Sequence, residues 1–233
     1  MRPARLRGPA LDKLAGPVRV PAVPAVGYPA RVGAGHDLVR ELPPVAPLLQ
    51  LAKEASACTR CRLAGGRTHT VFGMGNPRAG LMFVGEGPGE QEDLQGLPFV
   101  GRSGQLLDRL VFEEMNLTRH DFYIANTVKC RPPGNRDPLP DEIEACRPYL
   151  EKQLELIDPR VVVTLGNFAT KLLLGTSEGI SKLRGRAYPY GAGYLVPTFH
   201  PSAALRGGGS VVAQIRADLV RAKEALAWAR PQR

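Results

Sequence analysis

Short apolar runs alternate with amphipathic stretches along most of the chain. The runs are typical of buried strands and lie at Leu81 to Gly85, Phe122 to Val128, Val161 to Leu165 and Tyr194 to Phe199. Helical spacing of apolar residues predicts helices at 46–57, 103–115, 141–157 and 167–174 and a terminal helix striped by Val212, Ile215, Leu219, Ala222 and Leu226. Strands that alternate with helices imply crossover connections and a parallel sheet covered on both faces. The pattern therefore predicts an α/β fold of three layers, α/β/α, with a central, mostly parallel, four-stranded sheet flanked by helices.

The first 44 residues do not share this pattern. Prolines recur from Pro3 to Pro44, and no periodicity persists between them. Such a stretch cannot bury enough apolar surface to offset the entropy lost on ordering. We predict a flexible, basic, Pro-rich tail at 1–44 and a single domain at 45–230. The tail could tether DNA or dock a partner, but a dispensable extension is the favoured interpretation.

The charge balance favours an anionic partner. The 233 residues include 31 Lys and Arg against 22 Asp and Glu, a formal net charge of +9. Such a balance is typical of proteins that bind nucleic acid or an acidic membrane surface, although a merely soluble basic protein also fits. No apolar run approaches the roughly 20 residues that cross a bilayer, and no secretory signal is evident. We expect a cytoplasmic protein with no membrane association.

All four cysteines fall into a pattern that suits ligands. Cys58 and Cys61 form a C-x-x-C pair, whereas Cys130 and Cys146 follow much later. In a reducing compartment such thiols are more often ligands than disulfides. Four thiolates suit either a zinc ion or an iron–sulfur cubane, and the residues alone do not separate the two. A redox pair, or free buried thiols at the two later positions, are the alternatives.

A glycine-rich loop, GEGPGE, follows the first predicted strand. It resembles a dinucleotide fingerprint but lacks the third glycine, and Pro88 removes a backbone donor. The neighbouring carboxylates would also repel a pyrophosphate. The loop instead favours a small neutral pocket that holds a water molecule, although a tight turn with solvated acids remains possible. Asn126 and His200 also lie at the ends of predicted strands, where parallel sheets place their ligands.

Four segments in order carry a specific resemblance. GEGPGEQED, GLPFVGRSGQLLDRL, NTVKCRPPGNRDP and HPSAAL, within 47–228, resemble the family 4 uracil-DNA glycosylases. The resemblance implies the uracil-DNA glycosylase superfamily fold. It also implies a monomeric DNA repair enzyme that flips uracil out of DNA and hydrolyses its N-glycosidic bond. The product is an abasic site, without strand cleavage. A [4Fe–4S] cluster held by all four cysteines is implied as well, at Cys58, Cys61, Cys130 and Cys146.

The same resemblance implies roles for individual residues. Glu86 and Glu92 would lie near the attacking water, and Gly87 would offer a backbone contact to the base. Phe99 would stack on the flipped uracil, and Asn126 would hydrogen-bond its edge. His200 would face the uracil carbonyl where charge develops. A loop at 201–206 would enter the minor groove, with DNA contacts from Ser202, Leu205 and Arg206.

The chemistry of these residue types agrees with that activity. An extruded base can stack on an aromatic ring, and an asparagine amide can discriminate uracil from cytosine. A histidine can donate a hydrogen bond to the departing base. The alternatives are a catalytically inactive iron–sulfur module that binds nucleic acid or senses redox state, and a zinc-stapled structural protein. Phosphate contacts are expected from part of a basic set comprising Lys129, Arg131, Arg136, Arg184, Arg186 and Arg206.

Overall fold

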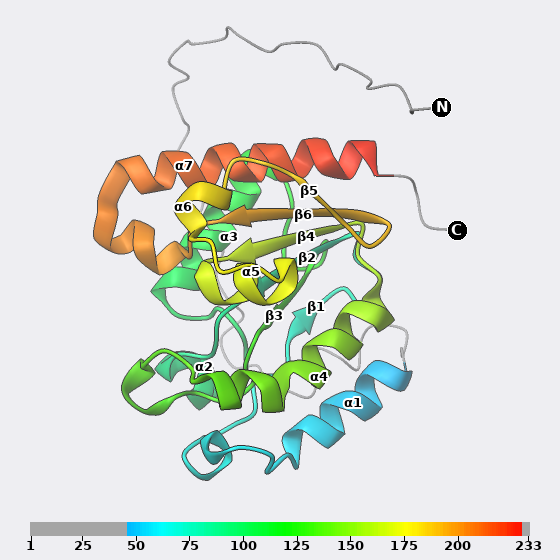
Figure 1. Cartoon of the computed structure of the whole chain (residues 1–233), viewed down its shortest axis with the longest axis vertical. Coiled ribbons are helices and arrows are strands. Elements are labelled where there is room, and N and C mark those ends of the chain that lie inside the picture. The colour runs from blue at the N-terminus through cyan, green and yellow to red at the C-terminus, as the bar shows by residue number, and fades with distance from the viewer. Residues whose placement is uncertain (1–45, 230–233) are drawn as a thin grey trace, which may run out of the picture. The chain divides into compact units, whose positions relative to one another are not determined.

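The computed structural model describes residues 46–229, which contain one six-stranded sheet of order β1-β3-β2-β4-β6-β5 (Figure 1). The strands are β1 (Met74–Gly75), β2 (Leu81–Gly85), β3 (Tyr123–Asn126), β4 (Val161–Leu165), β5 (Tyr188–Tyr190) and β6 (Gly193–Thr198). The four central strands β3, β2, β4 and β6 are parallel, whereas β1 and β5 pair antiparallel at the two edges. The predicted tail at 1–44 lies outside the described residues.

The central strands are the four that the apolar runs predict, but a sheet of only four strands is a wrong expectation. The two additional strands are two and three residues long, too short to produce an apolar pattern. Pro189 lies within β5. Proline is tolerated there because an edge strand leaves one row of its backbone groups unpaired.

Helices connect the strands and cover both faces of the sheet. The α-helices are α1 (Ala46–Ser56), α2 (Glu90–Gln95), α3 (Arg102–Met115), α4 (Pro140–Ile157), α5 (Asn167–Leu174), α6 (Ile180–Leu183) and α7 (Pro201–Trp228), with 3-10 turns η1 (Arg62–Gly65) and η2 (Pro133–Asn135). The helix predicted at 141–157 begins one residue earlier, at Pro140. Leu139 is its N-cap, and the Leu139 N–H donates to the Glu142 carboxylate at 2.8 Å.

Alternate residues of the strands build two apolar cores. Phe83 and its like-facing neighbours pack with buried residues of α3 and α7. Met82 and Val84 point to the opposite face, where they pack with residues of α1, α4 and α5. This alternation is the two-residue period of a strand. The predicted three-layer α/β/α architecture is therefore confirmed.

The segment predicted to be a loop at 201–206 is the start of α7. Pro201 is the first helical residue, where its missing N–H and restricted φ suit a helix start. His200 is the N-cap, and its side chain accepts a hydrogen bond from the Ser202 N–H. The helical geometry breaks at Gly208, whose φ is +66°. Residues Leu205 and Arg206 therefore lie on a short helical segment between His200 and this break.

None of the helices between residues 46 and 229 combines the length and the apolar character that crossing a membrane requires.

Candidate active site and four-cysteine site

The carboxyl ends of β2 and β3 meet at a narrow point. Gly85 ends β2 and pairs in register with Asn126, which ends β3. A Cβ on Gly85 would lie 2.5 Å from Asn126 Oδ1 and 2.5 Å from Phe99 Cζ. Only glycine leaves room for these two side chains beside the strand end. The sheet therefore brings together the asparagine and the phenylalanine that the sequence motifs single out.

Phe99 also lies beside His200. The centroids of the two rings are 5.8 Å apart, and their planes are tilted by 34°. His200 follows β6, which ends two residues earlier, whereas Phe99 precedes α3. Three residues from three distant segments thus share one edge of the parallel sheet, the edge at which such sheets bind ligands.

Asn126 carries a buried hydrogen-bond acceptor that no group within residues 46–229 satisfies. Its side chain is buried, and Oδ1 has no hydrogen-bond partner. A buried acceptor without a donor costs roughly 1–3 kcal/mol, so proteins rarely leave one unpaired. The geometry suits a ligand that enters beside Phe99 and supplies an N–H or O–H donor.

The hydrogen bonds of His200 determine which ring nitrogen carries the proton. Ser202 N–H donates to Nδ1 at 3.2 Å, and the Ser202 hydroxyl lies 2.8 Å from the same atom. Burial and the nearby positive charge of Arg206 lower the pKa of His200 to about 4. The ring is therefore neutral at physiological pH, with Nδ1 as acceptor and Nε2–H as a free donor.

Glu86 begins the loop after β2 and is half-buried. Burial, with a smaller contribution from the negative charge of Asp137, raises the pKa of Glu86 to about 7. The Glu86 carbonyl accepts from the Val128 N–H at 3.0 Å, which holds the loop against the end of β3. At the next position, a Cβ on Gly87 would lie 2.8 Å from Val128 Cγ2. The loop therefore packs tightly. With a pKa of about 7, the carboxyl group of Glu86 gains or loses its proton near neutral pH.

Glu92 has a different environment from Glu86. Its carboxylate accepts from the Gly89 N–H at 3.2 Å and from the Gly101 N–H at 2.8 Å. Gly89 is the N-cap of α2 and Gly101 the N-cap of α3. One side chain therefore joins the starts of two helices, between which Phe99 lies. Both carboxylate oxygens of Glu92 are thus engaged by backbone N–H groups.

Two residues that the sequence reasoning missed hold Phe99 in place. The backbone of Phe99 has φ +56°, a conformation unfavourable for a bulky residue. Arg119 donates to the carbonyls of Phe99 (2.7 Å) and Pro98 (3.2 Å) and pairs with Asp108. A Cβ on Gly104 would lie 1.7 Å from the Phe99 carbonyl oxygen. A glycine inside an amphipathic helix is a sequence signal for such close approach, whereas no local signal marks Arg119.

The predicted DNA-facing residues have different surroundings. Leu205 is 43% exposed, and Arg206 is also exposed. Ser202 is partly buried because it contacts His200. All three lie within the first two turns of α7. An exposed leucine beside an exposed arginine, close to His200, is a surface that can meet DNA.

Several basic residues are not available for phosphate contacts. Lys129, which we expected to be a candidate, is 1% exposed and faces the interior. Arg184 forms a two-pronged ion pair with buried Asp218, and Arg136 does so with buried Glu142. Each of these two arginines pairs with a buried carboxylate, so its charge is neutralised within the protein. Arg186 remains exposed.

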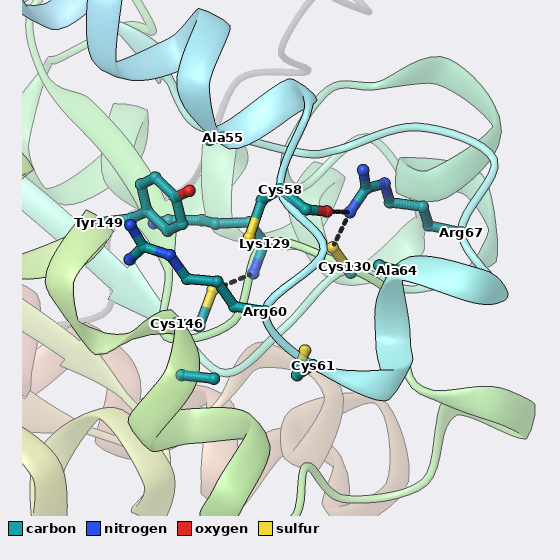
Figure 2. Close-up of a pocket in the computed structure, with 11 residues that line it drawn as sticks. Ala55, Cys58, Arg60, Cys61, Ala64, Arg67, Lys129, Cys130, Cys146 and Tyr149 are labelled. Atoms are coloured by element: carbon teal, nitrogen blue, oxygen red, sulfur yellow. Dashed lines mark hydrogen bonds between the residues drawn. The ribbon is translucent and has the colours of Figure 1, made fainter.

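The four cysteines line one cavity, shown in Figure 2, and are free thiols. Cys58 and Cys61 come from the segment after α1, Cys130 from the segment after β3, and Cys146 from α4. The same cavity is lined by three cationic residues, Arg60, Arg67 and Lys129. The cavity thus gathers thiols from three segments among positive charges.

N–H groups already point at two of the sulfurs. Arg67 donates to Cys130 Sγ at 3.4 Å and to the Cys58 carbonyl at 2.7 Å, while the Lys129 backbone N–H donates to Cys146 Sγ at 3.2 Å. Burial raises the pKa of Cys130, and it raises that of Cys146 to about 11. These thiols would become thiolates only with a cationic group bound among them, as in a metal site.

The cavity offers four soft thiol ligands, with N–H donors and cationic residues around them. Thiolates bind zinc or an iron–sulfur cluster, and N–H donors to sulfur together with nearby cations stabilise the negative charge of a cluster. Among residues 46–229, no three His, Cys, Asp or Glu side chains are already gathered around one metal position. The chemistry of the donor set therefore fits a group that is held by thiolates.

Comparison with known proteins identifies the family. The model of the uracil DNA glycosylase superfamily matches residues 72–223. The chain belongs to this superfamily. Its architecture, with helices on both faces of a mostly parallel sheet, is the one expected from that membership. The matched residues include Glu86, Phe99, Asn126 and His200, so the superfamily match contains the whole candidate pocket.

Individual relatives narrow the similarity within the superfamily. The chain is 46% identical to the type-4 uracil-DNA glycosylase of Saccharolobus solfataricus over 184 residues, which cover 76% of this chain and 85% of the relative. It is 44% identical to the type-4 enzyme of Thermotoga maritima over 180 residues, covering 76% and 93%. The type-5 enzyme of Thermus thermophilus is 32% identical over 57% of this chain and 68% of its own length. The type-4 enzymes are thus the more similar group among these.

Proposed function

We propose that the protein is a uracil-DNA glycosylase that hydrolyses the bond between uracil and deoxyribose in DNA. The buried, unpartnered Oδ1 of Asn126 beside Phe99 and His200 is the observation that carries this proposal. The type-4 relatives, named for the same activity, support it. Water adds across the C1′–N1 bond, so its oxygen joins the sugar and the departing uracil anion finally takes a proton. The DNA strand itself stays intact.

Uracil reaches this pocket only after it leaves the base stack. The flipped base would stack on Phe99, and aromatic stacking is worth about 1–3 kcal/mol per base. Uracil N3–H would donate to Asn126 Oδ1, and the amide NH₂ would donate to O4. Cytosine has an acceptor at N3 and a donor at its 4-position, so it would leave buried polar groups unpaired. Asn126 is therefore assigned the discrimination between the two bases.

His200 would stabilise the departing base. Its neutral ring presents Nε2–H as a donor because Ser202 occupies Nδ1. A donor aimed at a uracil carbonyl strengthens its hydrogen bond as negative charge develops there during bond cleavage. Glu86 would orient the attacking water, and in its ionised form it would favour the positive charge that develops on the sugar. Gly87 would offer its backbone to the base, and Glu92 would hold the surrounding helix starts together.

We assign the four-cysteine site to a [4Fe–4S] cluster held by Cys58, Cys61, Cys130 and Cys146. When bound, the cluster supplies four metal–thiolate links between separate segments and a centre capable of one-electron chemistry. The protein residues around it supply N–H donors and positive charge. No step of uracil release needs the cluster to change its redox state.

Uracil-containing DNA is the proposed partner. Ser202, Leu205 and Arg206 lie on the first turns of α7, next to the histidine that faces the base. Leu205 would fill the gap that the flipped base leaves in the stack, and Arg206 would contact a phosphate. We propose a monomer that acts on DNA in the cytoplasm.

The test is release of uracil from an oligonucleotide with one dU, read as strand breakage after alkali. Wild type with its cluster should release uracil, and Asn126→Ala should lose most of this activity while retaining the cluster and the thermal transition. An otherwise identical oligonucleotide with dC in place of dU is the specificity control. If cluster-loaded wild type released nothing from single- or double-stranded substrate, the assignment would be replaced by an inactive nucleic-acid-binding module.

A further inference from the structure

A buried lysine lies between the two sites. Lys129 is 1% exposed, and its ammonium donates to the Asn126 carbonyl oxygen at 2.7 Å and to Gln153 Oε1 at 2.5 Å. Its side chain therefore contacts the main chain of the base-pocket asparagine, and the next residue in the chain is Cys130. The uracil chemistry described above makes no use of this ammonium.

The partner of Lys129 is itself locked in orientation. The Gln153 amide NH₂ donates to the Phe72 carbonyl at 2.9 Å and lies 3.3 Å from the Tyr123 hydroxyl oxygen. Its Oε1 must therefore face Lys129, and Gln153 is fully buried. The Phe72 ring centroid lies 5.8 Å from Nζ. The ammonium is thus held in one place by groups from β3, α4 and the segment before β1.

The charge of Lys129 has no carboxylate partner among the described residues: its hydrogen bonds end on a carbonyl and an amide. A buried cation without an anion is costly, and proteins rarely retain one unless something opposite in charge is near. The residue instead lines the cavity of the four cysteines, together with Cys130 and Cys146. The Lys129 backbone N–H also donates to Cys146 Sγ at 3.2 Å (Figure 2). The cysteine site therefore contacts this residue through its main chain.

We propose that Lys129 is a positioning residue that couples the four-cysteine site to base recognition by Asn126. Its main chain is fixed at the cysteine sulfur, and its side chain fixes the main chain from which the Asn126 amide projects. This inference rests on the proposed function. In it, Lys129 fixes the orientation of Asn126 Oδ1 toward the base.

A purely structural network would give a different energetic signature. If Lys129 acts through Asn126, its removal should matter only while the Asn126 amide is present. If it merely supports the fold, its removal should add to the effect of any pocket variant. Two residues that act as one unit show strong non-additivity in a double-mutant cycle, whereas independent residues add. The cycle between Lys129 and Asn126 therefore separates the two roles.

The experiment compares Lys129→Met, Asn126→Ala and the double variant, each with its cluster loaded. Lys129→Met should lower kcat/KM on dU-containing DNA about tenfold and weaken inhibition by free uracil by a similar factor, as expected for loss of one charged hydrogen bond. In the Asn126→Ala background the same change should cost less than about twofold. Lys152→Met removes an equal charge from the exposed face of α4 and is the matched control.

Lys129→Arg tests the same point if the methionine variant does not fold. It keeps the charge and the donors, so it should retain the cluster absorption and recover part of the uracil affinity. Gln153→Met, which leaves the Lys129–Asn126 bond in place but frees the ammonium on one side, should give a smaller loss than Lys129→Met. Additive losses in the cycle, or unchanged uracil inhibition in cluster-loaded Lys129→Met or Lys129→Arg, would overturn the proposal. Inactive wild type would instead refute the proposed function.

Discussion

The base pocket and the four-cysteine site are built in opposite ways. Asn126 and His200 project from the ends of parallel strands, where neighbouring strands fix their positions. The cysteines come from a segment after α1, a segment after β3 and the helix α4. The pocket keeps one acceptor unpaired, whereas two of the cysteine sulfurs already receive N–H donors. The pocket is thus shaped by the sheet before any ligand arrives, and the cysteine site joins segments that have little else in common.

This difference separates two kinds of failure. Substitutions in the pocket should remove chemistry and leave the fold intact, because the sheet supports the pocket. Substitutions in the cysteine site should remove stability, because α1 and α4 meet there around a small core that includes Ala55, Leu63 and Tyr149. Variants of each site therefore test whether the two can be broken independently.

The largest effect is expected from Cys146→Ala. Loss of a structural metal site is among the most destabilising single changes, and we expect at least about 3 kcal/mol of unfolding free energy to disappear. For a domain of this size that lowers Tm by roughly 10 °C. Visible absorption, iron content and a thermal melt would measure it. A variant with normal Tm and no iron would show that the cluster does not stabilise the fold.

His200→Ala should act on catalysis alone. Removal of one donor to a developing anion costs about 100- to 1000-fold in kcat, while Tm and cluster absorption should stay at wild-type values. His120, exposed before β3, provides the matched control as His120→Ala. Single-turnover assays on dU-containing DNA would separate this loss from slow product release. A loss below tenfold would remove His200 from its assigned role.

Glu86→Gln tests the base pocket through the pH dependence of kcat. The pKa of Glu86 rises from its ordinary 4.5 to about 7, so the ionised form that orients water accumulates only as pH rises through about 7. Wild-type kcat should show a rising limb there, and Glu86→Gln should lose that limb and about 100-fold in kcat at pH 8. Exposed Glu151→Gln is the control. A pH profile identical in both enzymes would contradict the assignment.

The same substitution has a stability consequence of known sign. Because the folded state holds the Glu86 proton more tightly than the unfolded state, the contribution of Glu86 to stability is present below pH 4.5 and declines as pH rises through about 7. Glu86→Gln should therefore match wild type at low pH and exceed it at pH 8. Urea unfolding at both pH values measures the difference.

Arg119→Met should give an intermediate effect inside the pocket. It removes two charged hydrogen bonds that hold the backbone of Phe99 at positive φ. We expect kcat/KM to fall about tenfold as Phe99 relaxes, with the cluster retained. Arg109→Met, at an exposed position on α3, controls for loss of charge. Equal activity in the two variants would show that Phe99 holds its place without the clamp.

The smallest effect is expected from Leu205→Ala. Leu205 is exposed, so its contribution to activity should come from contact with DNA. KM for double-stranded substrate should rise about fivefold, whereas single-stranded substrate, which has no opposing stack to fill, should change less. Phe112→Ala, an equally exposed apolar change on α3, is the control. Equal losses on both substrates would argue against insertion into the duplex.

Much of the fold could be predicted from periodicity. Apolar runs of five or more residues marked the parallel strands, since both faces of such strands are buried. The edge strands were missed because two or three residues cannot show a period. The loop expected at 201–206 followed from the family resemblance alone, yet Pro201 suits a helix start and the helical geometry breaks only later, at Gly208.

The amino-acid sequence by itself determined the order of the motifs, the cysteine set and the parallel strands, because these depend on residue type and local spacing. Only the tertiary structure decided the direction and partner of each polar side chain. It turned Lys129 inward to Asn126, paired Glu92 with two backbone amides and left the Asn126 acceptor unpaired. Burial and hydrogen bonding depend on segments far apart in the chain, and no local pattern encodes which of them meet.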